Sequence, residues 1–211
     1  MPTHDYKNAD GQRLKGVTTI LNLLNKPALV GWAYKRGKEG VPLYESRDKA
    51  ATAGTHAHLM IEHHLKGLPD PPTDVLEKEI IDKAESCYIA YLDWEKNHNF
   101  KTVESEIPLV SNIYNYGGTI DRIGTVIHNL GIVDFKTGKD IYLASKIQVA
   151  AYGELWNENF PDNPVKEFHI LRIGEQGDFA HHYFPSLKDE FEIFRRLAEI
   201  QTILDKTGQK I

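Results

Sequence analysis

The sequence predicts an α/β fold in which a central β-sheet is flanked by helices and follows a helical N-terminal region. Three observations lead to this prediction: helical spacing of apolar residues before position 100, short β-branched runs between 101 and 137, and alternating helix and strand patterns from 142 onward. The 211 residues contain neither an internal repeat nor a long linker. We therefore expect one domain over 1–211, with a helical part at about 1–100, a sheet core at about 101–184 and a C-terminal helix at about 187–207.

The elements follow from periodicity and from turn residues. Helical spacing predicts helices over 29–38, 47–66 and 73–99, with Gly67 ending the second and Pro72 preceding the third. An antiparallel meander of three or four strands is expected over 101–137, with breaks at 111–112, 117–118 and 128–131. After it we expect a helix over 142–159, a hairpin of 165–173 with 178–184, and a closing helix over 187–206.

Composition excludes several classes of protein. No apolar run approaches the roughly 18 residues of a membrane-spanning helix, and the N-terminus lacks a secretion signal, so we expect a cytoplasmic protein without a membrane partner. The single cysteine, Cys87, excludes an intramolecular disulfide and a four-cysteine iron-sulfur cluster. A net charge of −5 argues against bulk coating of nucleic acid, although a local basic strip in the first fifty residues remains compatible with binding.

The most informative stretch is Gly131–Gly138, where Asp134 and Lys136 follow an apolar strand entry. Residues two apart on a strand share a face, so the carboxylate and the ammonium lie together. The carboxylate can hold a hard cation such as Mg²⁺, and the ammonium can orient an attacking water. The alternative is an ordinary surface ion pair at a strand end.

A second acid, Asp121, follows Gly117-Gly118 on the preceding strand. The turn near His128 to Gly131 folds it back beside Asp134, and two converging carboxylates repel unless a divalent cation lies between them. The alternative is that Asp121 pairs with Arg122 or another base at the surface.

Two helical pairs could complete this site. His58 and Glu62 are four apart, as are Gln148 and Tyr152, so each pair shares a helix face. His58 and Glu62 could reach the same cation, although a helical histidine is more often structural. Gln148 and Tyr152 present an amide and a phenol toward the site, or else form a polar cap above the core.

The joint order of these motifs resembles the RecB-like branch of the PD-(D/E)XK nuclease superfamily. The order is Gly54-Thr55-x-x-His58, the acid after Gly117-Gly118, Asp134-Phe135-Lys136-Thr137-Gly138, and then Gln148-x-x-x-Tyr152. The opening Gly16-Val17-Thr18-Thr19-Ile20-Leu21 is similar to that of small single-domain members, including the mitochondrial genome maintenance exonuclease and its phage relatives. The resemblance covers about 16–184 and implies a restriction-endonuclease-like core with a central mixed sheet.

The resemblance also implies residue roles. Asp121, Asp134 and Lys136 would be catalytic; Mg²⁺ or Mn²⁺ would bind to Asp121, Asp134, His58 and the carbonyl of Phe135; and Gln148 and Tyr152 would orient the substrate. Glu104 or Glu106 matches an acid that the family often has before the hairpin. Both are secondary candidates for the site, together with Glu62.

The implied function is a DNA exonuclease acting without strong sequence preference on single strands or duplex ends, in recombination, repair or replication. Trp32, Lys35 and Arg36 are expected to contact DNA, although Trp32 is equally explained as a core anchor and the basic residues as a solvated face. The resemblance implies a protein of the bacterial cytoplasm, which a phage could encode. A recombination or replication protein is a possible partner. A structure-selective or site-specific endonuclease of the same fold, and a catalytically silent DNA-binding module, are the alternatives.

Overall fold

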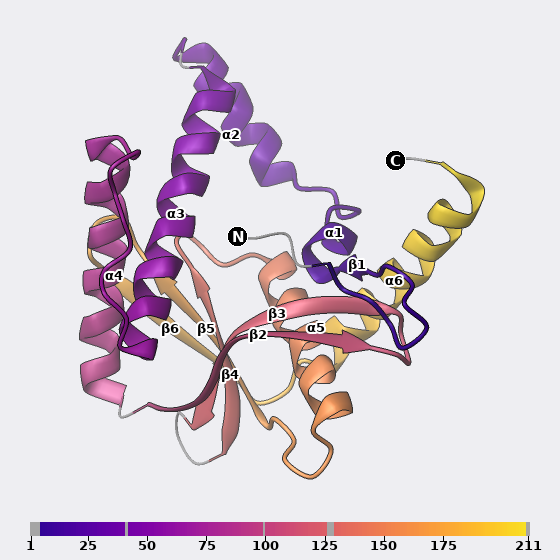
Figure 1. The fold of residues 1–211 in the computed structure, drawn as a ribbon. Helices are drawn as coiled ribbons and strands as arrows, with labels where there is room; N and C mark the ends of the chain where they lie inside the picture. The colour runs from indigo at the N-terminus through magenta and orange to yellow at the C-terminus, as the bar shows by residue number, and fades with distance from the viewer. Residues whose placement is uncertain (1–4, 41, 99, 126–128, 210–211) are drawn as a thin grey trace.

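A six-stranded mixed sheet forms the centre of the computed structural model, which describes residues 5–40, 42–98, 100–125 and 129–209 (Figure 1). The expected α/β class, a central sheet flanked by helices, is confirmed. In chain order the elements are β1 (Lys15–Gly16), α1 (Val17–Leu21), α2 (Pro27–Lys38), α3 (Leu43–Lys66), α4 (Lys78–His98), β2 (Lys101–Ser111), β3 (Tyr116–Thr125), β4 (Leu130–Lys136), α5 (Leu143–Asn159), β5 (Glu167–Ile173), β6 (Phe179–Phe184) and α6 (Lys188–Thr207).

The sheet combines both pairing modes. The expected antiparallel meander is β2, β3 and β4, and the expected hairpin is β5 with β6. Parallel pairing joins β4 to β5 and the short β1 to β3, so the neighbours run β1-β3-β4-β5-β6 while β2 pairs with β3. The long helix α5 makes the connection that a parallel β4–β5 pair requires.

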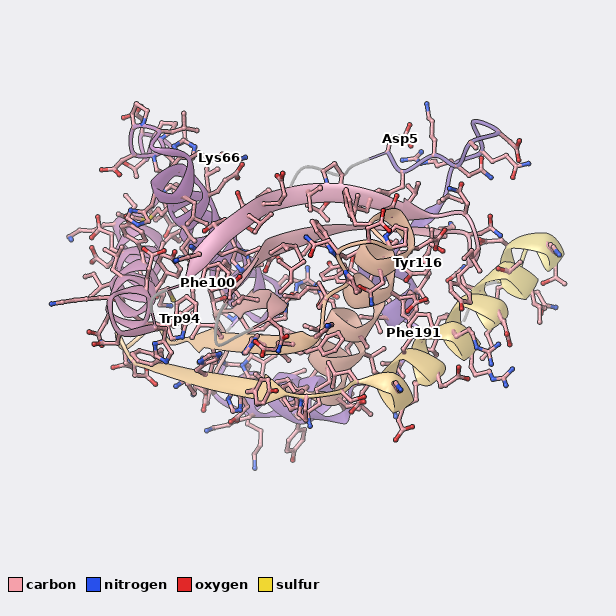
Figure 2. All side chains as sticks on the ribbon, turned by 90° about the horizontal axis from the view of Figure 1, so that it is seen from below. Asp5, Lys66, Trp94, Phe100, Tyr116 and Phe191 are labelled. Atoms are coloured by element: carbon pink, nitrogen blue, oxygen red, sulfur yellow. The ribbon has the colours of Figure 1, made fainter. Side chains whose placement is uncertain are left out.

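Two hydrophobic cores hold the layers together. One contains apolar side chains of α1, α5 and α6, and the other contains side chains of α3 and α4 packed on β4 and β5. Figure 2 shows Trp94 and Phe100 together beside α4, and Tyr116 and Phe191 toward the other end of the molecule. Neighbouring residues of one strand divide between the two cores, Ile132 and Ile170 in the first and Val133 and Leu171 in the second, so different helices cover the two faces of the sheet. Within the described ranges, no helix has the length and apolar character needed to span a membrane.

Several expected boundaries were wrong. The helix expected from residue 47 begins at Leu43, directly after Pro42, and the one expected from residue 73 begins at Lys78. In the latter case a turn closed by the Leu76 N–H on the Thr73 carbonyl occupies the first positions. Asn99, expected to end that helix, lies outside the described residues, as does His128 of the expected turn. The short elements β1 and α1 had no counterpart in the sequence prediction.

The expected strand break at Gly117-Gly118 was also wrong, because both glycines lie inside β3. A Cβ atom on Gly117 would come within 2.2 Å of the Tyr6 ring, and one on Gly118 within 2.7 Å of the Tyr152 ring. Glycine here allows two tyrosines to pack directly on the strand rather than ending it.

A chain of polar side chains is buried where β5 meets β6. His169 Nδ1 and His181 Nε2 lie 2.9 Å apart in a hydrogen bond, Glu167 Oε2 is 3.7 Å from His169 Nε2, and the His98 ring packs on His181. Burial lowers the pKa of both His169 and His181 to about 4; Glu167 opposes the shift at His169, while His169 and His98 add to it at His181. Both rings are therefore neutral in the folded protein near pH 7.

We expect the His169–His181 pair to make the protein less stable as the pH drops from about 6.5 toward 4. In that window the unfolded histidines bind protons that the folded ones do not, so the contribution of the pair is complete above the unfolded pKa and is lost on acidification. Urea unfolding at pH 7 and pH 5 measures the drop. The double substitution His169→Gln and His181→Gln should remove the pair's share, so that this variant loses less stability than the wild type between pH 7 and pH 5. His182→Gln on the same strand should follow the wild type; the same pH dependence in both variants would contradict the assignment.

Candidate active site

The candidate site lies where β3 and β4 separate. Their pairing runs from Thr125–Leu130 to Arg122–Val133, and beyond that point β4 stays paired with β5 as far as Lys136–Arg172. The Phe135 N–H donates instead to Asp121 Oδ2, at 2.9 Å. The Asp121 carboxylate thus replaces the missing backbone acceptor. This hydrogen bond holds Asp121 beside the Asp134-Phe135-Lys136 segment.

His58 reaches the same place from α3. Its Nδ1 lies 3.8 Å from Asp121 Oδ2, and its ring meets the Phe135 ring edge to face at 5.9 Å. The close approach of α3 depends on Gly54, where a Cβ atom would lie 2.6 Å from Thr137 Oγ1. The glycine of the Gly-Thr-x-x-His motif therefore allows the histidine helix to pack against the end of β4.

Glu106, on β2, is the third residue that lies close to Asp121 and His58. The β2–β3 register places it opposite Asp121, between the pairs Ser105–Arg122 and Ile107–Ile120. One ligand atom from each of His58, Glu106 and Asp121 lies within 4.8 Å of the other two. Glu106 has a φ of 51°, in the left-handed region that non-glycine residues rarely adopt, and such strain is concentrated at functional sites. Glu104 is exposed and pairs with Ile123 instead.

Asp134 and Lys136 form a pair next to this cluster. Lys136 Nζ lies 2.5 Å from Asp134 Oδ2; the carboxylate is fully buried, whereas a quarter of the lysine side chain is exposed. Asp134 is not among the three residues whose ligand atoms converge within 4.8 Å. The predicted roles of Asp134 and of the Phe135 carbonyl as cation ligands therefore stay predictions.

Burial dominates the protonation of these groups. It raises the pKa of Glu106 to about 8, reinforced by the charges of Asp121 and Glu62, and it raises the pKa of Asp134 to about 6 against the opposing charge of Lys136. The pKa of Asp121 is also raised by burial, while Lys136 and the Phe135 N–H pull it down. Burial and the nearby Lys136 lower the pKa of His58 to about 4. The Lys136 ammonium does not offset the desolvation of these carboxyl groups, since the pKa values of Asp121, Asp134 and Glu106 all stay raised.

Gln148 and Tyr152 lie together on α5, facing the acids. Gln148 Nε2 donates to Tyr152 Oη at 2.9 Å, and the Tyr152 ring packs on Gly118. Burial, followed by the charges of Asp121 and Asp134, raises the pKa of Tyr152. The phenol therefore stays protonated and can act as a hydrogen-bond donor near the acids.

The remaining predicted residues lie farther out. Glu62 pairs with Lys66 at 2.5 Å and influences the cluster through its charge. Trp32, Lys35 and Arg36 are on α2, which projects with the first part of α3 away from the sheet (Figure 1). Arg36 lies 6.0 Å from the centre of the half-buried Trp32 ring and pairs with Glu39.

Sequence reasoning missed Tyr6, which lies near this site. Its hydroxyl is 2.9 Å from Thr119 Oγ1, two residues before Asp121 on β3, and its pKa is raised by burial and by the charge of Glu106 despite the opposing Thr119 bond. No spacing pattern links residue 6 to residue 121. The surface alternative for Asp121 was also wrong, because Asp121 and Arg122 are both buried and Arg122 bonds elsewhere.

The three converging residues have the right chemistry for a divalent cation. His58 Nδ1 is buried without a hydrogen-bond partner, which suits an atom reserved for a ligand. Carboxylate oxygens suit Mg²⁺ and Mn²⁺, and a single imidazole is compatible with Mn²⁺. A bound cation would also stabilise the ionised carboxylates that burial disfavours.

Comparison with sequence families and with solved structures shows what this chain is similar to. The sequence profile of the PD-(D/E)XK nuclease superfamily matches residues 31–206, and the chain belongs to this superfamily. A solved structure of a candidate exonuclease from Eubacterium rectale is similar in fold, with a TM-score of 0.51 and 12% identity over 77% of this chain and 69% of that one. An alkaline exonuclease from Laribacter hongkongensis matches with a TM-score of 0.32 and 12% identity over 76% of this chain and 90% of that one. None of the curated protein sequences matches the chain.

Substitution of the two neighbouring glutamates should separate their roles. Glu106→Gln removes one charged oxygen ligand and should weaken Mn²⁺ binding by at least about tenfold, whereas Glu104→Gln should leave it unchanged. Isothermal titration calorimetry with Mn²⁺ measures both. Equal affinities in the two variants would exclude Glu106 from the cation site.

Proposed function

We propose that this chain is a Mg²⁺- or Mn²⁺-dependent deoxyribonuclease that hydrolyses phosphodiester bonds without strong sequence preference. The observation that carries the proposal is the convergence of His58, Glu106 and Asp121 beside the Asp134–Lys136 pair. Membership of a nuclease superfamily supports it, because the site uses the residue types that metal-assisted hydrolysis requires.

The mechanism assigns separate tasks to the residues. A divalent cation held by His58, Glu106 and Asp121, with Asp134 close by, would supply the charge that neutralises a phosphodiester. The Lys136 ammonium, directed by Asp134, hydrogen-bonds the attacking water and favours its deprotonated form. The Phe135 N–H keeps the Asp121 carboxylate aligned with the β4 segment.

Gln148 and Tyr152 orient the strand to be cut. Their mutual hydrogen bond fixes both side chains, and the protonated phenol donates toward a phosphate oxygen. Base edges take no part in this chemistry, so one site serves many sequences.

We further propose that the enzyme is an exonuclease acting on single strands or duplex ends of DNA. The projecting α2 offers Trp32 for base stacking and Lys35 and Arg36 for phosphates, a combination typical of single-strand binding. Recombination, repair or replication in a bacterial cytoplasm, whether for a host or a phage, is the proposed setting.

Removing the Lys136 charge should abolish chemistry rather than binding. We expect Lys136→Met to lower kcat on DNA by about 10²–10³-fold with little change in KM, because the ammonium acts on the attacking water. Asp134→Asn should behave similarly, and EDTA should abolish cleavage. Lys139→Met, which changes an exposed lysine just beyond the site, is the control. Full cleavage in both site variants, with the control also active, would defeat the proposed site.

A comparison of circular and linear DNA tests the mode of cleavage. An exonuclease needs an end, so we expect rapid digestion of a linear single strand and survival of the closed circle of the same sequence. Gel electrophoresis of the products distinguishes the two. Linearisation of the circle would instead identify an endonuclease of the same fold, and DNA binding without cleavage would identify a silent binding module.

A further inference from the structure

An ionic network centred on the buried Arg122 lies beside the candidate site. The Arg122 side chain is 1% exposed, and its guanidinium donates to Tyr91 Oη at 2.6 Å, to Glu95 Oε1 at 3.0 Å and, through Nε, to Thr102 Oγ1 at 3.0 Å. Its Cζ lies 3.9 Å from the centre of the Phe100 ring, a stacked cation–π contact. An arginine fork with this many fixed partners has one orientation.

The network continues from Glu95 to α3. Tyr91 also donates to Glu95, and His64 Nε2 lies 2.8 Å from the other carboxylate oxygen. Burial would raise the pKa of Glu95, but the bonds from Tyr91, His64 and Arg122 outweigh it and lower the pKa. Glu95 is therefore a charged carboxylate that connects an arginine on β3 with a histidine on α3. We call Arg122, Tyr91, Glu95, His64 and Thr102 the Arg122 network.

We call His58, Glu106 and Asp121 the cation cluster. Each element that contributes a residue to this cluster also contributes one to the Arg122 network. On β3, Arg122 follows Asp121 directly. On β2, Thr102 is four residues before Glu106, and on α3, His64 is six residues after His58. A separation of six residues is about 9 Å along a helix, and four residues is about 13 Å along a strand. The Arg122 network therefore links β2, β3 and α3 to one another at a second place, outside the cation cluster.

Stability alone does not account for such a network. Burying Arg122 and most of Glu95 incurs a desolvation penalty, and replacing a buried ion pair with apolar residues is often neutral or stabilising. What a fully bonded charged network adds is a single relative placement of the elements that it joins. Side chains around a cation need such placement, since residues beyond the ligands set the ligand orientation.

We infer that Arg122 is a positioning residue: through Thr102, Glu95 and His64 it holds β2, β3 and α3 in the arrangement that lets Glu106, Asp121 and His58 share one cation. This inference rests on the proposed function, because it takes those three side chains as the cation ligands. Arg122 acts on them through the backbone, since its own side chain is bonded to α4 and β2.

The test compares Arg122→Met with Arg172→Met. Arg172 is a partly buried arginine on β5 that pairs with Asp178, and β5 carries none of the cluster residues. Mn²⁺ affinity by calorimetry, urea unfolding in EDTA, and kcat and KM on DNA are measured for each. We expect Arg122→Met to bind Mn²⁺ about 10–100-fold more weakly, with KM for DNA unchanged and kcat restored by excess Mn²⁺. Arg172→Met should keep wild-type Mn²⁺ affinity.

Unchanged Mn²⁺ affinity in a folded Arg122→Met would overturn the positioning role and leave Arg122 as a structural residue only. If Arg122→Met does not fold, Thr102→Val carries the test, since it removes only the β2 link. A Mn²⁺ affinity at least several-fold weaker in that variant supports the role, and wild-type affinity overturns it. Failure of the wild-type protein to bind Mn²⁺ or to cut DNA would instead overturn the proposed function itself.

Discussion

The candidate site depends on the hydrogen bond between the Phe135 N–H and the Asp121 carboxylate. β3 and β4 stop pairing after Arg122–Val133, yet Phe135 is buried and its N–H still needs an acceptor. Asp121 provides it, and the carboxylate is thereby fixed between two separating strands. If β3 and β4 stayed paired, the Phe135 N–H would donate to a backbone carbonyl of β3. The Asp121 carboxylate would then have no hydrogen bond to β4.

That constraint also determines the electrostatics. An acid held between two strands is out of water, so the neighbouring acids Glu106 and Asp134 share the same desolvation. Lys136 offsets part of it at both Asp121 and Asp134, but the pKa of each stays raised. The cluster is therefore arranged so that additional positive charge is favourable, and His58 adds an imidazole that stays neutral and able to act as a ligand.

The sequence allowed prediction of features that depend on local spacing. Asp134 and Lys136 share a face because they are two apart on a strand, and Gln148 and Tyr152 meet because they are four apart on a helix. Glu106 could not be chosen over Glu104 in this way, because the choice depends on the β2–β3 register, which shifts between Thr102 and Glu104. The glycines of β3 were misread for a similar reason: their role lies in the contact with Tyr6 and Tyr152, distant in sequence.

The helix α3 has an anchored half and a projecting half. Between Gly54 and His64 it is fixed by the close contact with Thr137, by the buried Ala57 and Ile61, and by the His64–Glu95 bond. Its first turns and α2, which packs on it, project away from this anchored part (Figure 1). A cation site needs side chains held to fractions of an ångström, whereas contacts with a flexible nucleic-acid strand tolerate adjustment. In the function proposed above, one helix would meet both demands, because its anchored half carries the histidine and its projecting half supports the basic and aromatic side chains of α2.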